Sequence, residues 1–169
     1  MSEAEPLFRE ALEASRRILG DIHPDTLSSI NNLGSFLQAQ GKLREAEPLL
    51  REALEASRRT LGDTHPSTLG SINNLGSLLQ VQGKLREAEP LLKEALEVRR
   101  RTLGDTHPQT LISIGSLGAL LSQQGKLSEA EPLLREAVSG ARTTLGDAHR
   151  ATIIYQENLD FVLQKMGKA

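Results

Sequence analysis

Apolar residues recur at alternating three- and four-residue spacing along most of the chain, and this period predicts amphipathic α-helices. Residues 24–40 carry one such stripe, at Leu27, Ile30, Leu33 and Leu37. Residues 43–61 carry a second stripe, at Leu43, Ala46, Leu50, Ala53, Leu54, Ser57 and Leu61. Helix-forming residues fill both segments, while glycine and proline punctuate the junctions. The pattern therefore predicts a helical hairpin, with helix A over 24–40 and helix B over 43–61.

Local signals at the helix ends support these two elements. Pro24 suits the first position of a helix, and helix A should end before Gly41. Helix B has acidic residues near its start and Arg58 and Arg59 near its end, an order that suits the helix dipole. Pro48 removes a backbone donor inside the first turns of helix B, so we expect that helix to begin irregularly or to bend there.

The hairpin repeats along the chain with a period of 42 residues. The phrase Gly-Asp-x-His-Pro begins at Gly20, Gly62 and Gly104, and a fourth copy at Gly146 has arginine in place of proline. Residues 20–61 differ from residues 62–103 at only eight positions. A fixed period of roughly 20 to 50 residues indicates a solenoid or a propeller. Propeller blades need alternating strand patterns, which this chain lacks, and aromatic residues, which make up only 2% of it, so the period favours a helical solenoid.

The period divides residues 1–169 into a single predicted array. Its units are a half repeat over 2–19 (helix B), full repeats over 20–61, 62–103 and 104–145, and a half repeat over 146–169 (helix A). About eight helices follow, in B-then-A order. Residues 2–19 repeat the interior sequence without a preceding helix A that would cover them, and neither end has the polar outer face of a dedicated cap.

The core positions resemble those of the tetratricopeptide repeat (TPR). The matching residues of one repeat are Leu33, Gly34, Leu37, Gly41, Ala46, Leu50 and Ala53. The longer phrase that runs from His-Pro-x-Thr-Leu through Gln-Gly-Lys-Leu to Leu-Gly-Asp is similar to the 42-residue variety of kinesin light chains, and it covers nearly the whole chain. This pattern favours the TPR over HEAT or armadillo units. The resemblance implies an all-α fold, a right-handed α-solenoid of antiparallel helix hairpins that serves as a protein-interaction scaffold.

Composition narrows the choice of partner. The net charge of −2 over 169 residues gives no electrostatic basis for binding nucleic acid or an anionic membrane. No apolar stretch approaches the length of a membrane span, and the first residues carry glutamates and a proline where a signal peptide would be basic and then apolar. The absence of cysteine permits a reducing compartment. We therefore expect a cytoplasmic protein, with a protein or peptide as its partner.

The residues that could carry chemistry have structural explanations. One histidine precedes each predicted helix A, at His23, His65, His107 and His149. Neighbouring repeats lie roughly 10 Å apart, and metal bonds of about 2 Å cannot span that distance, so we predict that these histidines cap helices. The aspartates that follow glycine, such as Asp21, are turn formers. The chain has no phosphate loop, nucleophile elbow or carboxylate pair, and we predict a protein without catalytic activity, metal or cofactor.

A ladder of arginines lies four residues beyond core positions of the B helices. Its members are Arg16, Arg58, Arg100 and Arg142. In one interpretation their stems cover the core and their guanidinium groups meet the aspartate-bearing turns. In the other they contact an acidic ligand. Other charged residues of helix B, such as Glu47 and Arg51, alternate in sign at four-residue spacing and indicate a solvated helix face.

In TPR arrays helices A form the concave surface, and the resemblance implies a peptide-binding groove there. The candidate residues are Asn31, Asn32, Ser35, Gln38, Asn73, Asn74, Ser77, Gln80, Ser116 and Asn158. Amide side chains both donate and accept hydrogen bonds, so they could hold a peptide backbone. Alternatively, the asparagines bond to one another as a ladder between helices. Gly115 in the third repeat interrupts the track of amides.

Helices A of the three full repeats contain no lysine or arginine. TPR domains that clamp a terminal carboxylate use such residues. We therefore expect no carboxylate clamp, and a ligand that is extended, mostly neutral and bound through its backbone.

The last predicted helix departs most from the others, because apolar residues replace mainly small or polar residues of the earlier helices A. They include Ile154, Tyr155, Phe161 and Val162. These side chains either cover the end of the stack or form a surface for a partner or a second copy. The leading hypothesis is a peptide-binding scaffold. The alternative is a structural array that self-assembles through its uncapped terminal helices.

Overall fold

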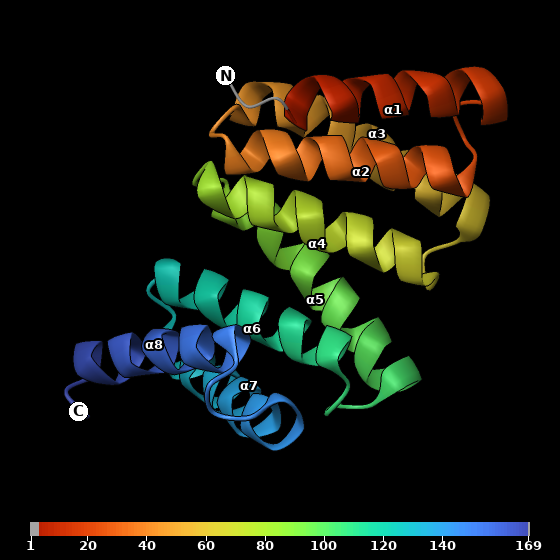
Figure 1. Cartoon of the computed structure of the whole chain (residues 1–169). Helices are drawn as coiled ribbons and strands as arrows, with labels where there is room; N and C mark the ends of the chain where they lie inside the picture. Colours follow the sequence, from red (N-terminus) through yellow and green to blue (C-terminus); the bar gives the residue numbers. More distant parts are fainter. Residues whose placement is uncertain (1–3, 169) are drawn as a thin grey trace. The chain divides into compact units, whose positions relative to one another are not determined.

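The computed structural model describes residues 4–168, which form eight α-helices and no strand (Figure 1). The helices are α1 (Ala4–Leu19), α2 (Pro24–Ala39), α3 (Leu43–Leu61), α4 (Pro66–Val81), α5 (Leu85–Leu103), α6 (Pro108–Gln123), α7 (Leu127–Leu145) and α8 (Arg150–Lys165). The even-numbered helices are helices A and the odd-numbered ones are helices B. The predicted all-α class and the eight helices are confirmed for the described residues. No helix within this described part of the chain is both long and apolar enough to cross a membrane.

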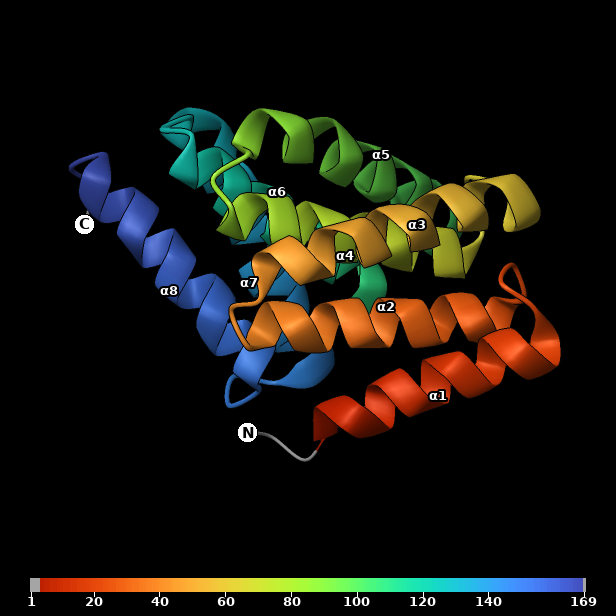
Figure 2. The same cartoon turned by 90° about the horizontal axis from the view of Figure 1, so that it is seen from above.

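The helices group into two compact units, a first unit over Met1–Gln82 and a second unit over Gly83–Ala169. In the first unit α1 packs on α2, α2 on α3 and α3 on α4, and the two A helices α2 and α4 also touch (Figures 1 and 2). The second unit repeats this scheme with α5 to α8, and α6 touches α8. Each unit therefore consists of antiparallel hairpins whose helices A lie side by side.

A histidine caps each A helix. The residues His23, His65, His107 and His149 have extended backbones, and each Nδ1 accepts a hydrogen bond from the N–H of the residue two positions on, at 3.1–3.2 Å. One of the N–H groups that a helix start leaves without a partner is thereby satisfied. Proline at the first helical position adds a preset φ angle in three of the four. The predicted capping role is confirmed.

The Gln-Gly-Lys turn ends each full A helix through a left-handed glycine. Gly41 has φ of 75°, which glycine adopts without a Cβ penalty. Its N–H donates to the carbonyl of Gln38 at 2.9 Å, and the N–H of Lys42 donates to that of Leu37 at 2.9 Å. These bonds satisfy the last carbonyls of α2 and turn the chain into α3.

Pro48 does not interrupt α3, which runs unbroken from Leu43 to Leu61. The carbonyl that loses its helical donor belongs to Arg44, an exposed residue of the first turn, where water can replace the bond. At the start of the helix the N–H groups of Glu45 and Ala46 both donate to the carbonyl of Lys42, a shared bond that is common at helix ends and does not involve Pro48. Lys42 itself provides no side-chain cap.

Small residues set the distance between helices A and B. A Cβ placed on Gly34 would lie 2.6 Å from Cδ2 of Leu50, and one on Gly118 would lie 2.9 Å from Cδ2 of Leu134. Both leucines are fully buried. A close approach of helices A and B is therefore present at these glycines in both units, and larger residues there would push the hairpins apart.

Candidate peptide-binding surface

In the first unit, four of the predicted groove residues bond to one another or to a neighbouring helix A. The amide Nδ2 of Asn31 donates to the Oγ of Ser71 at 2.7 Å, and Nδ2 of Asn74 donates to Oδ1 of Asn31 at 3.3 Å. Further along, Nε2 of Gln38 donates to Oγ of Ser77 at 2.9 Å. These bonds form the ladder between α2 and α4 that one of the two interpretations predicted, so much of the amide capacity is used inside the chain.

Other groove residues of the first unit keep polar atoms available. Asn32 is exposed, and Ser35 and Gln80 are half-buried on the same side of α2 and α4. Asn73 lies deeper, and its Oδ1 is enclosed without a hydrogen-bond partner. Asn32, Ser35 and Gln80 are therefore the groups that can still bond to a peptide on this side of helices A, which we call the A-helix face.

In the second unit, a tyrosine interrupts the amide track. A Cβ on Gly115 would collide with the ring of Tyr155, which reaches from α8 into the space that glycine leaves on α6. Tyr155 is buried, and burial raises the pKa of its hydroxyl. Positions 31 and 115 are equivalent in the repeat, as are positions 71 and 155. The structure thus explains why glycine stands at position 115 where the first unit has Asn31: the residue opposite is Tyr155, where the first unit has Ser71.

Large apolar side chains occupy the A-helix face of the second unit. Ile112 on α6 and Ile154 and Phe161 on α8 are 40%, 41% and 49% exposed. Their spacing from Ser116 and Asn158 places all five side chains on one side of the two touching helices. Ile154 and Phe161 were predicted as candidates for self-association, and they therefore lie beside the predicted groove residues.

The expected self-association set needs a correction. Tyr155 is only 8% exposed and Val162 is fully buried, because both pack into the second unit rather than facing solvent. They cover the core, as the first of the two interpretations had it, and are not available to a second copy.

The arginine ladder meets the acids of the chain itself. The Nε atoms of Arg16, Arg58, Arg100 and Arg142 lie 3.4, 3.4, 3.2 and 2.9 Å from the aspartates of the following turns, Asp21, Asp63, Asp105 and Asp147. Arg16 also pairs with Glu52, and Arg100 with Glu136, on the next helix B of the same unit. The arginines thus hold turns and consecutive B helices together, and contact with an acidic ligand stays a prediction without support in this geometry.

Family models of the tetratricopeptide repeat match residues 1–25, 26–67 and 67–143. A crystal structure of nearly identical, kinesin-light-chain TPR-like repeats from Podosopora anserina has 30% identity to this chain, with a TM-score of 0.81. The match covers 98% of this chain and 79% of that one. The chain is a tetratricopeptide repeat protein.

Two further crystal structures are similar to this TPR protein. A variant of the P. anserina repeats is 29% identical, with a TM-score of 0.83, over 98% of this chain and 78% of that one. BtubC (BKLC) from P. vanneervenii is 21% identical, with a TM-score of 0.84 over 98% of this chain and 66% of that one, and shares the fold. No curated protein matches the sequence. TPRs generally mediate protein–protein interactions and are typically non-enzymatic.

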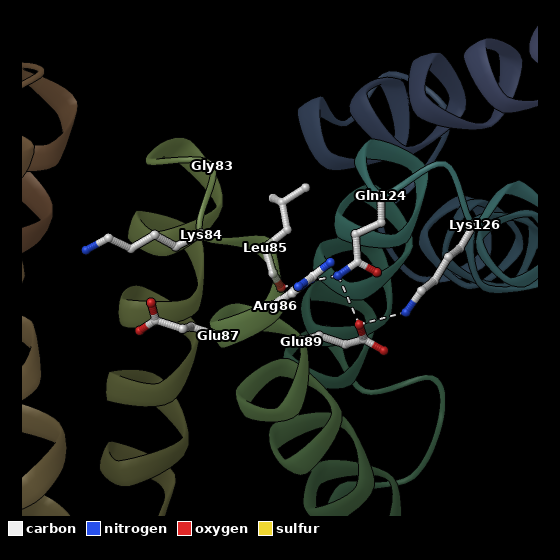
Figure 3. A pocket seen from close by; sticks show the side chains of 8 residues that line it. All are labelled: Gly83, Lys84, Leu85, Arg86, Glu87, Glu89, Gln124 and Lys126. Carbon is white, nitrogen blue, oxygen red and sulfur yellow. Dashed lines mark hydrogen bonds and ion pairs between the residues drawn. The ribbon is translucent and has the colours of Figure 1, made fainter.

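A carboxylate network on the B helices of this TPR protein was not predicted. Glu89 accepts hydrogen bonds from Lys93 at 2.7 Å, Lys126 at 2.8 Å and Gln124 at 2.9 Å, beside a hollow of about 560 Å³ (Figure 3). Hydrogen bonds, first that from Lys126, lower the pKa of Glu89 to about 2. Gln124 and Lys126 thus bond to Glu89 across the hollow, and these bonds link one repeat to the next.

The same link recurs at the equivalent glutamates. Glu5 is bonded by Lys42 and Arg9, and Glu131 by Lys168 and Arg135, and these bonds lower the pKa of both carboxyl groups. From the sequence, these glutamates were predicted only to belong to a solvated helix face with charges of alternating sign. The missed signal is the lysine that follows the turn glycine at the end of each helix A, because it always lies 37 residues after the glutamate.

One buried cation was also missed. Arg99 is 3% exposed, and its Nη1 donates to the Oγ of Ser113 at 2.6 Å and to the carbonyl of Gln109 at 3.2 Å. Burial lowers the pKa of this guanidinium. In the preceding repeat the equivalent position holds the shorter Ser57. The longer Arg99 side chain joins α5 to the first turns of α6. Within residues 4–168, no three histidine, aspartate or glutamate side chains gather as a metal site.

Proposed function

We propose that this TPR protein is a non-catalytic interaction scaffold that binds an extended peptide along its A-helix face, in the concave groove that the family resemblance implies. The observation that carries the proposal is the apolar surface of the second unit. Ile112, Ile154 and Phe161 are exposed there on two touching helices, with Ser116 and Asn158 on the same side. Exposed apolar side chains that cluster beside polar groups are typical of protein-interaction sites.

Peptide side chains supply the affinity in this arrangement. An apolar side chain of the ligand that removes roughly 100 Å² of apolar surface from water gains about 2.5 kcal/mol. Ser116 and Asn158 have hydrogen-bonding groups that suit the ligand backbone. The second unit therefore selects peptides by apolar side chains spaced to reach α6 and α8.

The A-helix face of the first unit offers neutral polar contacts. Asn32, Ser35 and Gln80 keep donors and acceptors there, and neither α2 nor α4 contains a lysine or arginine. A peptide bound on this unit therefore meets amide and hydroxyl groups and no positive charge from α2 or α4. Such a peptide is expected to be neutral and to be held through its backbone.

The test is binding of peptides selected from a displayed library against the whole chain. Ile154→Ser and Phe161→Ser should each weaken the selected peptides by about tenfold, because each removes one apolar contact. Ile153→Ser is the matched control, since Ile153 is 46% exposed on another side of the same helix, and it should change affinity less than about twofold. Equal losses for all three variants, or no loss for any, would contradict the proposal.

A further inference from the structure

One side of α1 carries an apolar stripe that the first unit covers only in part. Its positions alternate by three and four residues: Ala4, Leu7, Ala11, Ala14 and Ile18. Leu7 is 65% and Ile18 is 72% exposed. The adjoining side of α1 makes the contact with α2, where Phe8 lies against Phe36 at 4.9 Å between ring centroids and Leu12 is buried. The stripe therefore extends the apolar surface of the helix beyond its contact with α2.

The small residues of this stripe occupy positions that pack against a helix in the next repeat. In α3 the equivalent positions, 42 residues on, include Ala46, Ala53 and Ala56, and all three are buried. These small side chains allow another helix to approach closely there. On α1 the same small residues form the centre of the stripe, and the larger Leu7 and Ile18 stand at either end.

The stripe is complementary to itself. Its spacing is that of positions a and d of a heptad repeat, and in an antiparallel pair each a position faces a d position of the other helix. Around a two-fold axis, Leu7 of one copy then faces Ile18 of the other, and Ala11 faces Ala14. Each contact occurs twice, because a two-fold interface uses the same patch on both copies.

Charges beside the stripe match the same register. Glu10 and Arg17 occupy the flanking g positions, which face each other in an antiparallel pair, so each Glu10 meets the Arg17 of the other copy. Both residues are exposed, and neither forms an ion pair within residues 4–168. The residue equivalent to Glu10 in the next repeat, Glu52, bonds to Arg16 of α1 at 2.6 Å. That pair shows that a glutamate at this position can bridge two helices.

We propose that two copies of this chain associate through α1 in an antiparallel, two-fold symmetric pair. The partner is a second copy of the same chain, and the association is closed, because each copy has one α1. It is independent of the proposed peptide binding, which uses helices A and not α1.

Stacking of α1 onto α8 of another copy is blocked by polar residues. Asp160 occupies the position of Gly34 and Gly118, where even a Cβ would collide with the following helix B. Gln156 occupies the position of the fully buried Ile114, and its Nε2 donates to Oδ1 of Asp160 at 2.7 Å. A helix B cannot dock on this polar pair as α3 docks on α2, so the two-fold pairing of α1 is favoured over an open chain of copies.

The test is the mass of the whole chain by sedimentation over about 1 to 500 µM, since a small interface gives a weak complex. The mass should rise toward twice 18.4 kDa and stop there. Glu10→Arg should abolish the rise, because each Arg17 then meets a like charge, and the double variant Glu10→Arg with Arg17→Glu should restore it. Helical circular dichroism checks that every variant is folded.

Matched variants distinguish this interface from general stickiness. Ile18→Glu should keep the chain monomeric, whereas Phe161→Glu, an equally drastic change on the A-helix face, should leave the dimer intact. A constant monomer mass at all concentrations would overturn the proposal. So would a mass that climbs beyond the dimer, or a double charge reversal that fails to restore association.

Discussion

At the scale of single residues, the recurring glutamate of helix B does more than its place in a row of alternating charges indicates. Glu89 receives three hydrogen bonds, two of them from residues of the next repeat, Gln124 and Lys126. Its side chain is only 16% exposed, so water screens these contacts less than it screens an ordinary surface pair. The carboxylate therefore ties the start of helix B to the turn that precedes the next helix B.

This network predicts acid sensitivity. The pKa of Glu89 in the folded chain is about 2, below its ordinary value of 4.5, so its stabilisation is complete above pH 4.5 and is lost as pH falls toward 2. Glu89→Gln should lower the free energy of unfolding by about 1 kcal/mol at neutral pH. Urea denaturation should show this difference shrinking to nothing near the folded pKa. Glu97→Gln, an exposed change on the same helix, should show no such trend.

A second residue-scale prediction concerns the break in the amide track. Gly115→Asn should destabilise the second unit by about 2 kcal/mol or more, because the new side chain collides with the ring of Tyr155. Combining it with Tyr155→Ser recreates the Asn31–Ser71 pairing of the first unit, at 2.7 Å, and should recover part of the loss. A thermal-denaturation cycle measures the coupling. Strict additivity of the two changes would contradict this explanation.

Some residue roles follow from sequence and others need coordinates. The histidine caps were predictable, because capping depends only on neighbours along the chain. The bonds of Glu89 were not, since they depend on which side chains meet across helices. The same limit explains why Tyr155 was expected on a surface: its spacing shows that it lies on a helix, whereas its burial depends on the glycine opposite, Gly115.

At the scale of elements, the sequence determines the helices almost completely. The expected A helix over 24–40 and B helix over 43–61 correspond to α2 at Pro24–Ala39 and α3 at Leu43–Leu61. Strong caps and left-handed glycines punctuate each boundary, so tertiary packing has little left to decide there. The effect of Pro48 was harder to predict, because it depends on whether the freed carbonyl faces water.

The caps are worth testing one at a time. His65→Ala removes the acceptor that bonds the N–H of Ser67 at 3.1 Å, and it should cost about 1 kcal/mol of stability. His65→Asn keeps a capping acceptor and should cost about half as much or less. Chemical denaturation of the three proteins separates the cap from simple loss of the ring. Equal losses in both variants would mean that the ring, and not the bond, carries the effect.

At the scale of the whole molecule, the 42-residue period predicted a helical solenoid, because each repeat packs mainly on its neighbours. The spaced core positions, such as Gly34 and Ala46, then favoured the TPR. The surface chemistry could not be predicted as firmly. In the first unit the amides of Asn31 and Gln38 already bond to serines of α4. The second unit instead presents Ile154 and Phe161 on the corresponding side of its helices A. Which groups stay free depends on distances between helices.

The distribution of charge over the molecule makes a further prediction. Because α2, α4 and α6 contain no lysine or arginine, no cationic side chain on those helices can clamp a terminal carboxylate. A selected peptide and its C-terminal amide should therefore bind with affinities within about twofold of each other. Isothermal titration of both forms measures the ratio, and a strong preference for the free acid would contradict the neutral groove.

The claim that peptides bind on the A-helix face is tested most directly by mapping a bound peptide with NMR chemical shifts. On addition of a selected peptide to the whole chain, the largest changes should appear at Ile112, Ser116, Ile154, Asn158 and Phe161. Residues on the outer sides of the B helices, such as Glu55 and Glu97, should stay unchanged. Changes confined to the B helices would contradict the proposed binding surface.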